Sequence, residues 1–139
     1  MNERDEQRVT YDAPNGNFSY QQWESSNGVT RARSQGVQDL AGCRHIHRFL
    51  EEATARCGRR LRVLVDISEL TDCLPPARQY MMNHLHGLGA PAERTAFIGA
   101  NRWLRQMLNL YALIAATPFR VFDTEEQALS WLEEGRPDE

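Results

Sequence analysis

The sequence predicts an α/β fold, in which an antiparallel N-terminal portion joins a mostly parallel sheet covered by helices. Two Asn-Gly pairs, at 15–16 and 27–28, separate three short segments of alternating apolar and polar residues, which is the pattern of β-hairpins. After residue 37, segments with helical spacing alternate with short apolar segments. Because such alternation requires crossover connections between strands, it favours a parallel β-α-β-α-β-α core.

The first third of the chain is predicted to form three antiparallel strands. Val9, Tyr11 and Ala13 alternate with polar residues before the first turn, and residues 18–24 and 29–34 form the second and third strands. Asn-Gly pairs adopt the positive φ angles that tight hairpin turns need. The third segment, VTRARS, is so polar that we expect one side of it to face solvent.

The rest of the chain is predicted to alternate helices and strands. Apolar residues recur every three or four positions from Leu40 to Cys57, which marks one face of a helix that Gly58 ends. The segment LRVLVDI, residues 61–67, is typical of a strand buried on both faces. The further elements are a helix from about 76 to 88 with Leu85 and Leu88 turned inward, a strand at 94–100, a helix at 101–116, a strand at 119–122, and a helix capped by Thr124 and closed by Gly135.

Length, composition and charge describe an ordinary soluble protein. The 139 residues suit one domain, which we place at residues 8–135 between charged tails at 1–7 and 136–139. The net charge of −3 gives no electrostatic basis for binding nucleic acid. No apolar segment approaches the ~20 residues that span a bilayer, so we expect no membrane insertion. Three cysteines without CxxC spacing fit reduced thiols in a cytoplasmic protein.

Three segments of the chain resemble a known family. They are VLVDISELTD (63–72), TAFIGANRWLRQML (95–108) and FRVFDTEEQALSWLEEG (119–135). They contain a strand that ends in Asp66, a strand that ends in a small-residue turn at Gly99, and a final strand ending at Phe122 before a helix with Trp131 and Leu132. In these features the chain resembles the STAS-like family related to sporulation anti-sigma-factor antagonists, and in particular its single-domain bacterial branch. The resemblance extends from about residue 9 to residue 135.

The resemblance implies a non-enzymatic regulatory protein. In typical family members, a Ser in an Asp-Ser-Ser/Thr-Gly loop between the central strand and the next helix is phosphorylated by a partner kinase. The added charge decides whether the two proteins bind. Here Asp72 takes the place of the motif's Asp, but Cys-Leu-Pro at 73–75 replaces the residues that follow it. The motif is therefore absent, and Ser68 and Thr71 are the remaining candidate phospho-acceptors.

The helix after this loop is poorly suited to a phosphate. A helix N-terminus binds phosphate through free backbone N–H groups, and the pair Pro75–Pro76 lacks two of them. The carboxylate of Asp72 would also repel a phosphate. The alternative interpretation is that Asp66, Ser68, Thr71 and Asp72 make local turn and capping hydrogen bonds.

Cys73 is a candidate nucleophile, because it lies near a predicted helix start, where a thiolate is favoured. Asp72 opposes that charge, and no partner histidine can be assigned from the sequence. The simpler interpretation is a small apolar side chain beneath the loop. Cys43 and Cys57 lie on the apolar face of the first helix, so we expect both in the core.

The four histidines form two His-x-His pairs, His45 with His47 and His84 with His86. Residues two apart on a helix point about 200° from each other, so neither pair forms a ready chelate. A zinc site that united the two helices would need three or four converging ligands. We therefore predict no metal site.

Four arginines, Arg56, Arg59, Arg60 and Arg62, surround the end of the first helix. Positive charge at a helix C-terminus complements the helix dipole, so a structural role in contact with solvent is the simplest interpretation. The alternative is a surface that binds an anion or an acidic partner.

The helix predicted at 101–116 has a wide apolar surface. Its apolar side chains, from Trp103 to Ala115, fill an arc of about 160°, whereas a helix packed on one sheet face needs about 100°. Leu113 lies outside this arc. We expect the neighbouring helix to cover the excess; otherwise it contacts a partner subunit or lines a pocket for an apolar ligand. Such a pocket occurs in the lipid-binding CRAL-TRIO fold, which this architecture distantly resembles.

We predict a binding module without catalytic residues, cofactor or metal. A protein partner, or a second copy of the chain, would contact the loop at 66–78 and the apolar helix at 103–114. The predicted contact residues are Asp66, Ser68, Thr71, Asp72, Cys73, Arg78, Arg102, Trp103, Gln106, Leu110 and Leu113. One alternative is a carrier or sensor of a small apolar or lipid-like ligand, which requires an enclosed cavity of several hundred Å³. The others are an enzyme that uses Cys73 with a histidine, and a phospho-switched anti-sigma-factor antagonist.

Overall fold

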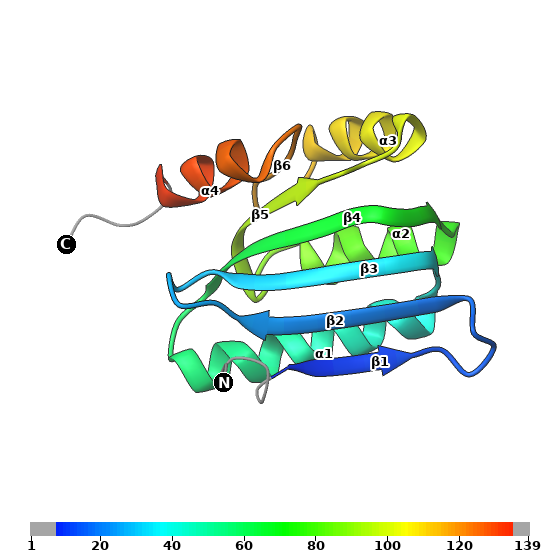
Figure 1. Cartoon of the computed structure of the whole chain (residues 1–139), viewed down its shortest axis with the longest axis horizontal. Coiled ribbons are helices and arrows are strands. Elements are labelled where there is room, and N and C mark those ends of the chain that lie inside the picture. The colour runs from blue at the N-terminus through cyan, green and yellow to red at the C-terminus, as the bar shows by residue number, and fades with distance from the viewer. Residues whose placement is uncertain (1–7, 135–139) are drawn as a thin grey trace.

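Six strands form one mixed sheet in the order β1-β2-β3-β4-β5-β6 (Figure 1). The computed structural model describes residues 8–134. The strands are β1 (Val9–Asp12), β2 (Phe18–Glu24), β3 (Thr30–Gln38), β4 (Leu61–Cys73), β5 (Ala92–Ile98) and β6 (Phe119–Phe122). β1, β2 and β3 pair antiparallel, whereas β3, β4, β5 and β6 pair in parallel. The predicted fold class and order of elements are confirmed.

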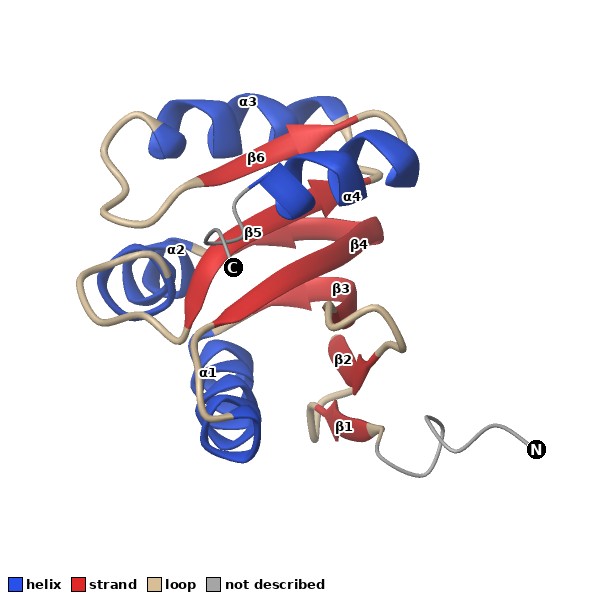
Figure 2. Cartoon of the chain, turned by 90° about the vertical axis from the view of Figure 1, so that its left-hand side faces the viewer, coloured by secondary structure: helices blue, strands red, loops and turns tan. Residues whose placement is uncertain are grey.

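Helices cover both faces of the sheet. They are α1 (Leu40–Cys57), α2 (Pro75–Tyr80), which runs directly into the π-helical turn η2 (Met81–Leu85), α3 (Arg102–Ala112) and α4 (Glu125–Glu134). In the view of Figure 2, α1, α2 and α3 lie on one side of the strands and α4 lies on the other. The larger core therefore lies between the sheet and α1, α2, η2 and α3, and a smaller core lies under α4.

β4 occupies the middle of the sheet, and its first half is buried on both faces. Val63 and Val65 belong to the larger core, while Leu64 belongs to the smaller core with Ala128 and Leu132 of α4. Successive side chains of a strand point to opposite faces, so a strand covered on both sides needs a continuous apolar run. This explains the composition of LRVLVDI and confirms the predicted central strand.

Polar side chains and a glycine define the helix ends. Asp39 and Asn101 each accept a hydrogen bond at 2.8 Å from the backbone N–H three residues later, at the starts of α1 and α3. Thr124 does the same for α4 at 3.2 Å, which confirms the predicted cap. Gly58 ends α1 with a φ of 74°, as predicted. The predicted end at Gly135 lies outside the described residues.

β4 is longer than we predicted. We expected a loop from Asp66 to Arg78, but the strand continues to Cys73 and α2 begins at Pro75. The reason is that β3 extends to Gln38 and pairs with β4 over this whole length. Several side chains in this half of β4 are exposed, so the apolar pattern that identifies a buried strand stops before the strand does.

Two bulges distort the second half of β4. Arg33 of β3 pairs with Asp66 of β4, and the next pair joins Gln35 to Glu69. Between these two pairs β4 has one more residue than β3. Thr71 is a second extra residue, further along the strand. Bulges bend a strand and re-aim its side chains, and they are common beside functional sites.

Three details of the predicted helices are wrong. Leu88 is 93% exposed, because it follows the end of η2. Cys57 is exposed rather than in the core, because it is the last residue of α1. The helix predicted to reach residue 116 ends at Ala112, and the backbone that follows turns to donate hydrogen bonds to the carbonyl of His86.

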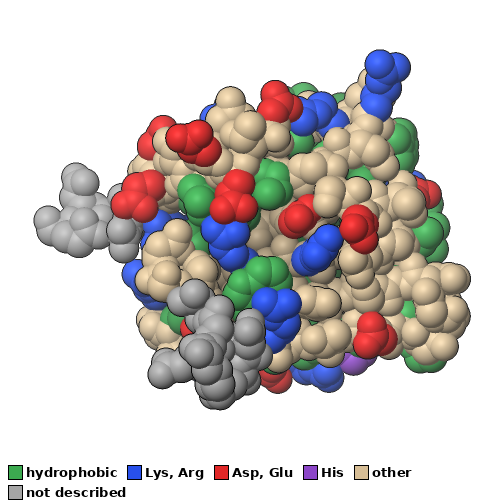
Figure 3. All heavy atoms as spheres, viewed as in Figure 1, with side chains coloured by type: hydrophobic (Ala, Val, Ile, Leu, Met, Phe, Trp, Pro, Cys, Tyr) green, Lys and Arg blue, Asp and Glu red, His purple; other side chains and the backbone are tan. Residues whose placement is uncertain are grey.

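The face of the N-terminal strands opposite α1 is polar. Figure 3 views this face, on which acidic and basic side chains are interspersed. Glu69 of β4 accepts a hydrogen bond from Gln35 at 2.8 Å and pairs with Arg33 at 3.2 Å. Arg31 pairs with Glu125 of α4 at 2.9 Å. These contacts confirm that one side of VTRARS faces solvent.

The connection from β5 to α3 crosses β4 at Gly99. This residue has a φ of +82°, which side chains with a Cβ rarely adopt. A Cβ at this position would lie 2.7 Å from Cβ of Ser68 and 2.9 Å from its Cα and N atoms. The close approach of the two backbones therefore requires glycine.

Gly99→Ala should destabilise the fold by more than Gly16→Ala. Both positions have positive φ, so they share a strain of about 1–2 kcal/mol, but a Cβ on Gly16 would meet no atom within 4 Å. The overlap with Ser68 should add roughly 1–3 kcal/mol to the free energy lost by Gly99→Ala. Urea unfolding of both variants and the wild type measures the difference. Equal losses would contradict the close crossing.

Candidate functional site

The second half of β4 lacks a strand on the β5 side, and the start of α3 takes that place. β5 pairs with β4 only up to Asp66. Beyond this point the side-chain amide of Asn101 donates to the carbonyls of Leu70 and Thr71, at 3.4 Å each. Backbone groups that are not paired in a sheet need such partners. The N-terminal end of α3 is thus fixed to the extended end of β4.

Trp103 joins α3 to the β4–α2 segment. Its indole Nε1–H donates to Oδ1 of Asp72 at 2.9 Å. The guanidinium carbon of Arg78 lies 5.9 Å from the centre of the same indole, within the range of a cation–π contact. The structure therefore brings together the two segments that the sequence analysis singled out, residues 66–78 and the apolar helix.

Large apolar side chains are exposed on α3 and in the turn that follows it. The exposed fractions are 48% for Trp103, 64% for Leu110, 81% for Leu113 and 72% for Ile114, and Leu74 at the start of α2 is 38% exposed. We expected the neighbouring helix to cover the excess apolar arc, and this expectation is wrong. We call the surface formed by Leu74, Arg78, Trp103, Leu110, Leu113 and Ile114 the α2–α3 face.

Four of the other predicted contact residues form two pairs in different places. Arg102 and Gln106 are exposed on α3 beside the apolar residues. Asp66 lies near Glu125 of α4, because its charge acts on the pKa of that carboxyl group. The pKa of Glu125 is lowered chiefly by its hydrogen bond from Arg31, and the charge of Asp66 opposes this lowering. Ser68 lies against Gly99. Neither Asp66 nor Ser68 therefore belongs to the α2–α3 face.

Leu74 and Ile114 belong to the face and lie within the predicted contact segments, 66–78 and 103–114, but they were not among the individually predicted contact residues. Ile114 was within the 160° arc estimated from helix geometry. Leu74 precedes the two prolines that start α2, and an apolar residue immediately before such a start was the signal that could have identified it.

The polar residues of β4 make local hydrogen bonds. The Thr71 hydroxyl donates to the carbonyl of Gly36 at 3.0 Å. Asp66 accepts from the backbone N–H of Ser68 at 2.9 Å, and Asp72 accepts from that of Cys73 at 2.8 Å. α2 begins with two prolines and has no side-chain cap. These contacts agree with the structural interpretation of this segment and leave few donors for a phosphate.

Cys73 is buried beneath the face. Burial raises the pKa of its thiol to about 12, and the neighbouring Cys43 and the charge of Asp72 add to the shift while Arg78 opposes it. Burial also raises the pKa of the Cys43 thiol, to about 11. A nucleophilic cysteine needs a depressed pKa, so this environment is the opposite of an activating one.

The members of each His-x-His pair point apart, as predicted, but His47 and His84 meet at Tyr80, with their ring centres 5.6 Å apart. His45 stacks on Tyr11 with ring centres 4.0 Å apart. His47 shares a 2.8 Å hydrogen bond with the Tyr80 hydroxyl, and His84 stacks on the Tyr80 ring at 4.1 Å. Within residues 8–134, no group of three or more His, Cys, Asp or Glu side chains is arranged to hold a metal ion.

His86 is buried beside a small apolar cavity. Its side chain lines the cavity with core residues of the sheet, α1 and α3, and its Nδ1 atom has no hydrogen-bond partner. The cavity measures about 60 Å³, well below the roughly 300–1,000 Å³ of ligand pockets. The enclosed cavity of several hundred Å³ that the ligand-carrier alternative requires is therefore not found among the described residues.

Comparison with known proteins identifies the family. A model of the SpoIIAA-like family matches residues 29–133, which is well over half of the chain. The chain belongs to the SpoIIAA-like family. The predicted resemblance to STAS-like sporulation proteins is thereby confirmed. No curated protein shows a significant match to this SpoIIAA-like sequence.

A solved structure supports the SpoIIAA-like fold. The crystal structure of an uncharacterised protein from Shewanella loihica PV-4, described as having a SpoIIAA-like fold, matches with a TM-score of 0.60 at 20% identity. The match covers 83% of this chain and 93% of that chain. At this identity the likeness concerns the fold. In the part of this SpoIIAA-like chain that the structure describes, no helix is long and apolar enough to cross a bilayer.

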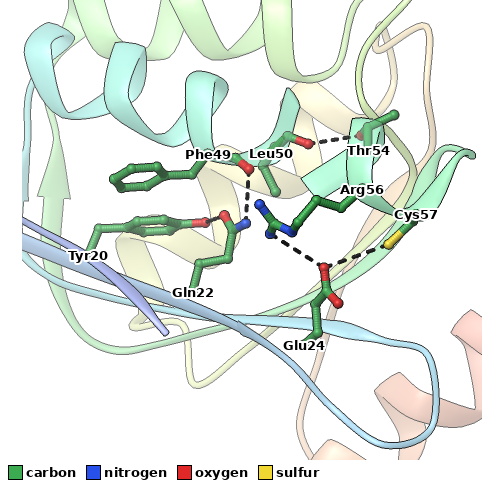
Figure 4. Close-up of polar contacts among 8 residues, drawn as sticks. All are labelled: Tyr20, Gln22, Glu24, Phe49, Leu50, Thr54, Arg56 and Cys57. Atoms are coloured by element: carbon green, nitrogen blue, oxygen red, sulfur yellow. Dashed lines mark hydrogen bonds and ion pairs between the residues drawn. The ribbon is translucent and has the colours of Figure 1, made fainter. Parts of the chain in front are cut away.

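The arginines around the end of α1 make structural contacts. Figure 4 shows Arg56 paired with Glu24 of β2 at 3.5 Å, and the exposed Cys57 thiol beside the same carboxylate. Arg60 donates to the backbone carbonyls of Ala90 and Ala92. Arg56 and Arg60 agree with the structural interpretation, but Arg62 is buried and pairs with Glu133 at 3.8 Å instead of facing solvent.

Cys57 should react with iodoacetamide in the native protein, whereas Cys43 and Cys73 should react only after unfolding. The two buried thiols are inaccessible, and burial raises their pKa values to about 11 and about 12. Partial burial and Glu24 raise the pKa of Cys57 as well, so its expected reactivity rests on its exposure. Peptide mapping by mass spectrometry, with and without urea, measures the extent of alkylation at each site. Rapid native modification of Cys73 would revive the enzyme alternative.

His86 should make the fold sensitive to mild acid. Burial lowers its pKa from 6.5 to about 3, so below pH 6.5 the unfolded chain binds a proton that the folded chain does not. The free energy of unfolding should then fall by up to about 1.4 kcal/mol per pH unit. Urea unfolding between pH 7 and 5 should show a weaker slope for His86→Phe than for the wild type. The exposed His84→Gln variant controls for loss of a histidine, and equal slopes in all three would contradict the assignment.

Proposed function

We propose that this SpoIIAA-like chain is a non-enzymatic interaction module that binds a protein partner through the α2–α3 face. The observation that carries the proposal is the exposure of Trp103 and Leu110 on α3 and of Leu113 and Ile114 in the turn that follows it. Single exposed apolar residues are ordinary on protein surfaces, but a contiguous group of large ones is typical of a binding surface.

The composition and order of the face suit protein binding. Trp and Arg are the residues that most often dominate interface energetics, and Trp103 and Arg78 lie side by side here. Trp103 is also held by Asp72, so little side-chain freedom would be lost on binding. Such preorganisation lowers the cost of association.

The interior supports binding rather than chemistry as the role of this chain. The thiol pKa of Cys73 is raised rather than depressed, which disfavours a nucleophile. Burial lowers the pKa of His86 to about 3, and its Nδ1 atom has no hydrogen-bond partner through which it could activate the Cys73 thiol. We therefore assign no reaction to the chain and no catalytic role to these residues.

Leu113→Glu should weaken partner binding or self-association at least about tenfold while leaving the fold intact, because a charge would be desolvated in the interface but not in the free protein. Leu113 is 81% exposed, so its replacement removes little core packing. Ala41→Glu, at an exposed position on α1, is the matched control. Sedimentation velocity measures self-association, and quantitative pull-down against immobilised wild type and variants measures partner capture. Equal association of the wild type and Leu113→Glu would exclude this face.

A further inference from the structure

Basic and acidic residues are segregated along the chain. Residues 73–122, which contain α2, η2 and α3, hold five of the 16 arginines but one of the 19 acidic residues, Glu93. The rest of the chain therefore carries a large acidic excess, although the net charge of the whole is only −3. The segment that forms most of the α2–α3 face is therefore positive, and Asp72, just before it, adds one carboxylate, which accepts the hydrogen bond of Trp103.

Two of these arginines are available to a partner, Arg78 on the face and the exposed Arg102 beside it. Arg105 pairs with Asp123 at 2.7 Å, and Arg94 donates to the backbone carbonyl of Trp131. Within the described residues, no ion pair joins Arg78 or Arg102 to a carboxylate. The Nε atom of Arg78 is buried and has no hydrogen-bond partner.

A groove separates the α2–η2 segment from α3. It has a volume of about 410 Å³ and is lined by Arg78, Met82, Tyr111 and Ile114 among others. Apolar side chains thus form part of the groove, and Arg78 supplies a cation within it. Leu110 on α3 and Leu113 just after the helix remain exposed. A groove of this kind between two helices is a common receptor for the apolar face of a third helix.

We propose that the groove between α2–η2 and α3 binds an amphipathic helix of a partner protein, whose apolar side chains enter the groove and whose flanking carboxylates pair with Arg78 and Arg102. This inference rests on the proposed function and specifies the chemistry of the partner. Charge-assisted, bidentate contacts between arginine and carboxylate would fix the orientation of the bound helix.

Other occupants fit the same surface less well. In a symmetric pair of copies, Arg78 and Arg102 would face the same positive surface, and like charges across an interface are unfavourable. Residues 1–7 and 135–139 of this sequence are acidic but lack apolar residues at helical spacing. An anionic bilayer would contact the exposed side chains of α3 but would leave the groove unfilled, and two unpaired arginines add only about 1 kcal/mol each to such binding.

A peptide selection tests the proposal. The probe is a phage-displayed library of peptides of about 16 residues, roughly four helical turns, with apolar residues fixed at i, i+3, i+4 and i+7. The flanking positions are drawn equally from Glu, Lys and Gln. Peptides enriched on the immobilised wild type are synthesised with their Glu→Lys counterparts, and dissociation constants are measured by fluorescence anisotropy at two salt concentrations.

The expected result is enrichment of Glu, with binding weakened about tenfold by the Glu→Lys change and also weakened by higher salt. Ile114→Glu should abolish peptide binding, and the control Ala41→Glu should leave it unchanged. The double variant Arg78→Glu with Arg102→Glu should shift the preference at the flanking peptide positions from Glu toward Lys. Arg102→Glu alone provides a second variant, at an exposed position. Thermal unfolding verifies that each variant is folded.

Three outcomes would overturn the proposal. Enrichment without a preference for Glu, but with loss of binding in Ile114→Glu, would reject the acidic partner and leave the interaction surface intact. If peptides bind the Ile114→Glu variant and the wild type equally tightly, the groove is not the binding site. If Leu113→Glu also leaves association unchanged, the proposed function fails too. Flotation of the wild type with phosphatidylglycerol vesicles, when no peptide binds, would assign the face to a membrane surface instead.

Discussion

The unequal reach of the two strands beside β4 is the constraint on which the rest of the structure depends. β3 pairs with β4 as far as Cys73, but β5 pairs with β4 only as far as Asp66. The remaining edge of β4 needs hydrogen-bond partners, and the start of α3 provides them through Asn101. Gly99 allows the chain to pass close enough for this contact. α3 is thereby held over the extended end of β4, and its outer surface is directed to solvent.

Much of the fold could be predicted from local pattern, because local pattern reports local burial. Alternation, helical spacing and the run LRVLVDI each reflect the faces that a segment covers, and all the elements they predict are present. The second half of β4 could not be predicted in this way. Its pairing partner, residues 35–38 of β3, lies more than thirty positions earlier in the chain, and side chains such as Ser68 and Thr71 are exposed and carry no apolar signal.

The candidate site was only partly predictable for a related reason. Helix geometry indicated that the apolar arc of α3 is wider than one sheet face requires, but the sequence does not reveal how much of that arc a neighbouring helix covers. The answer depends on α2, which has only six residues before it becomes η2 and leaves a groove beside Ile114. The burial of His86 depends likewise on Phe97 and Phe119, which come from two strands later in the chain.

The π-helical turn sets the angular relation between the two ends of the α2–η2 segment. In such a turn a backbone N–H bonds to the carbonyl five residues earlier, as that of His86 does to Met81 at 2.9 Å, and one more residue is accommodated than in an α-helix. Deleting that residue would restore α-helical winding and rotate one end against the other by about 100°. Arg78 would then point away from the groove while Leu85 stayed in the core. The length of this segment is therefore constrained more tightly than the identity of its side chains.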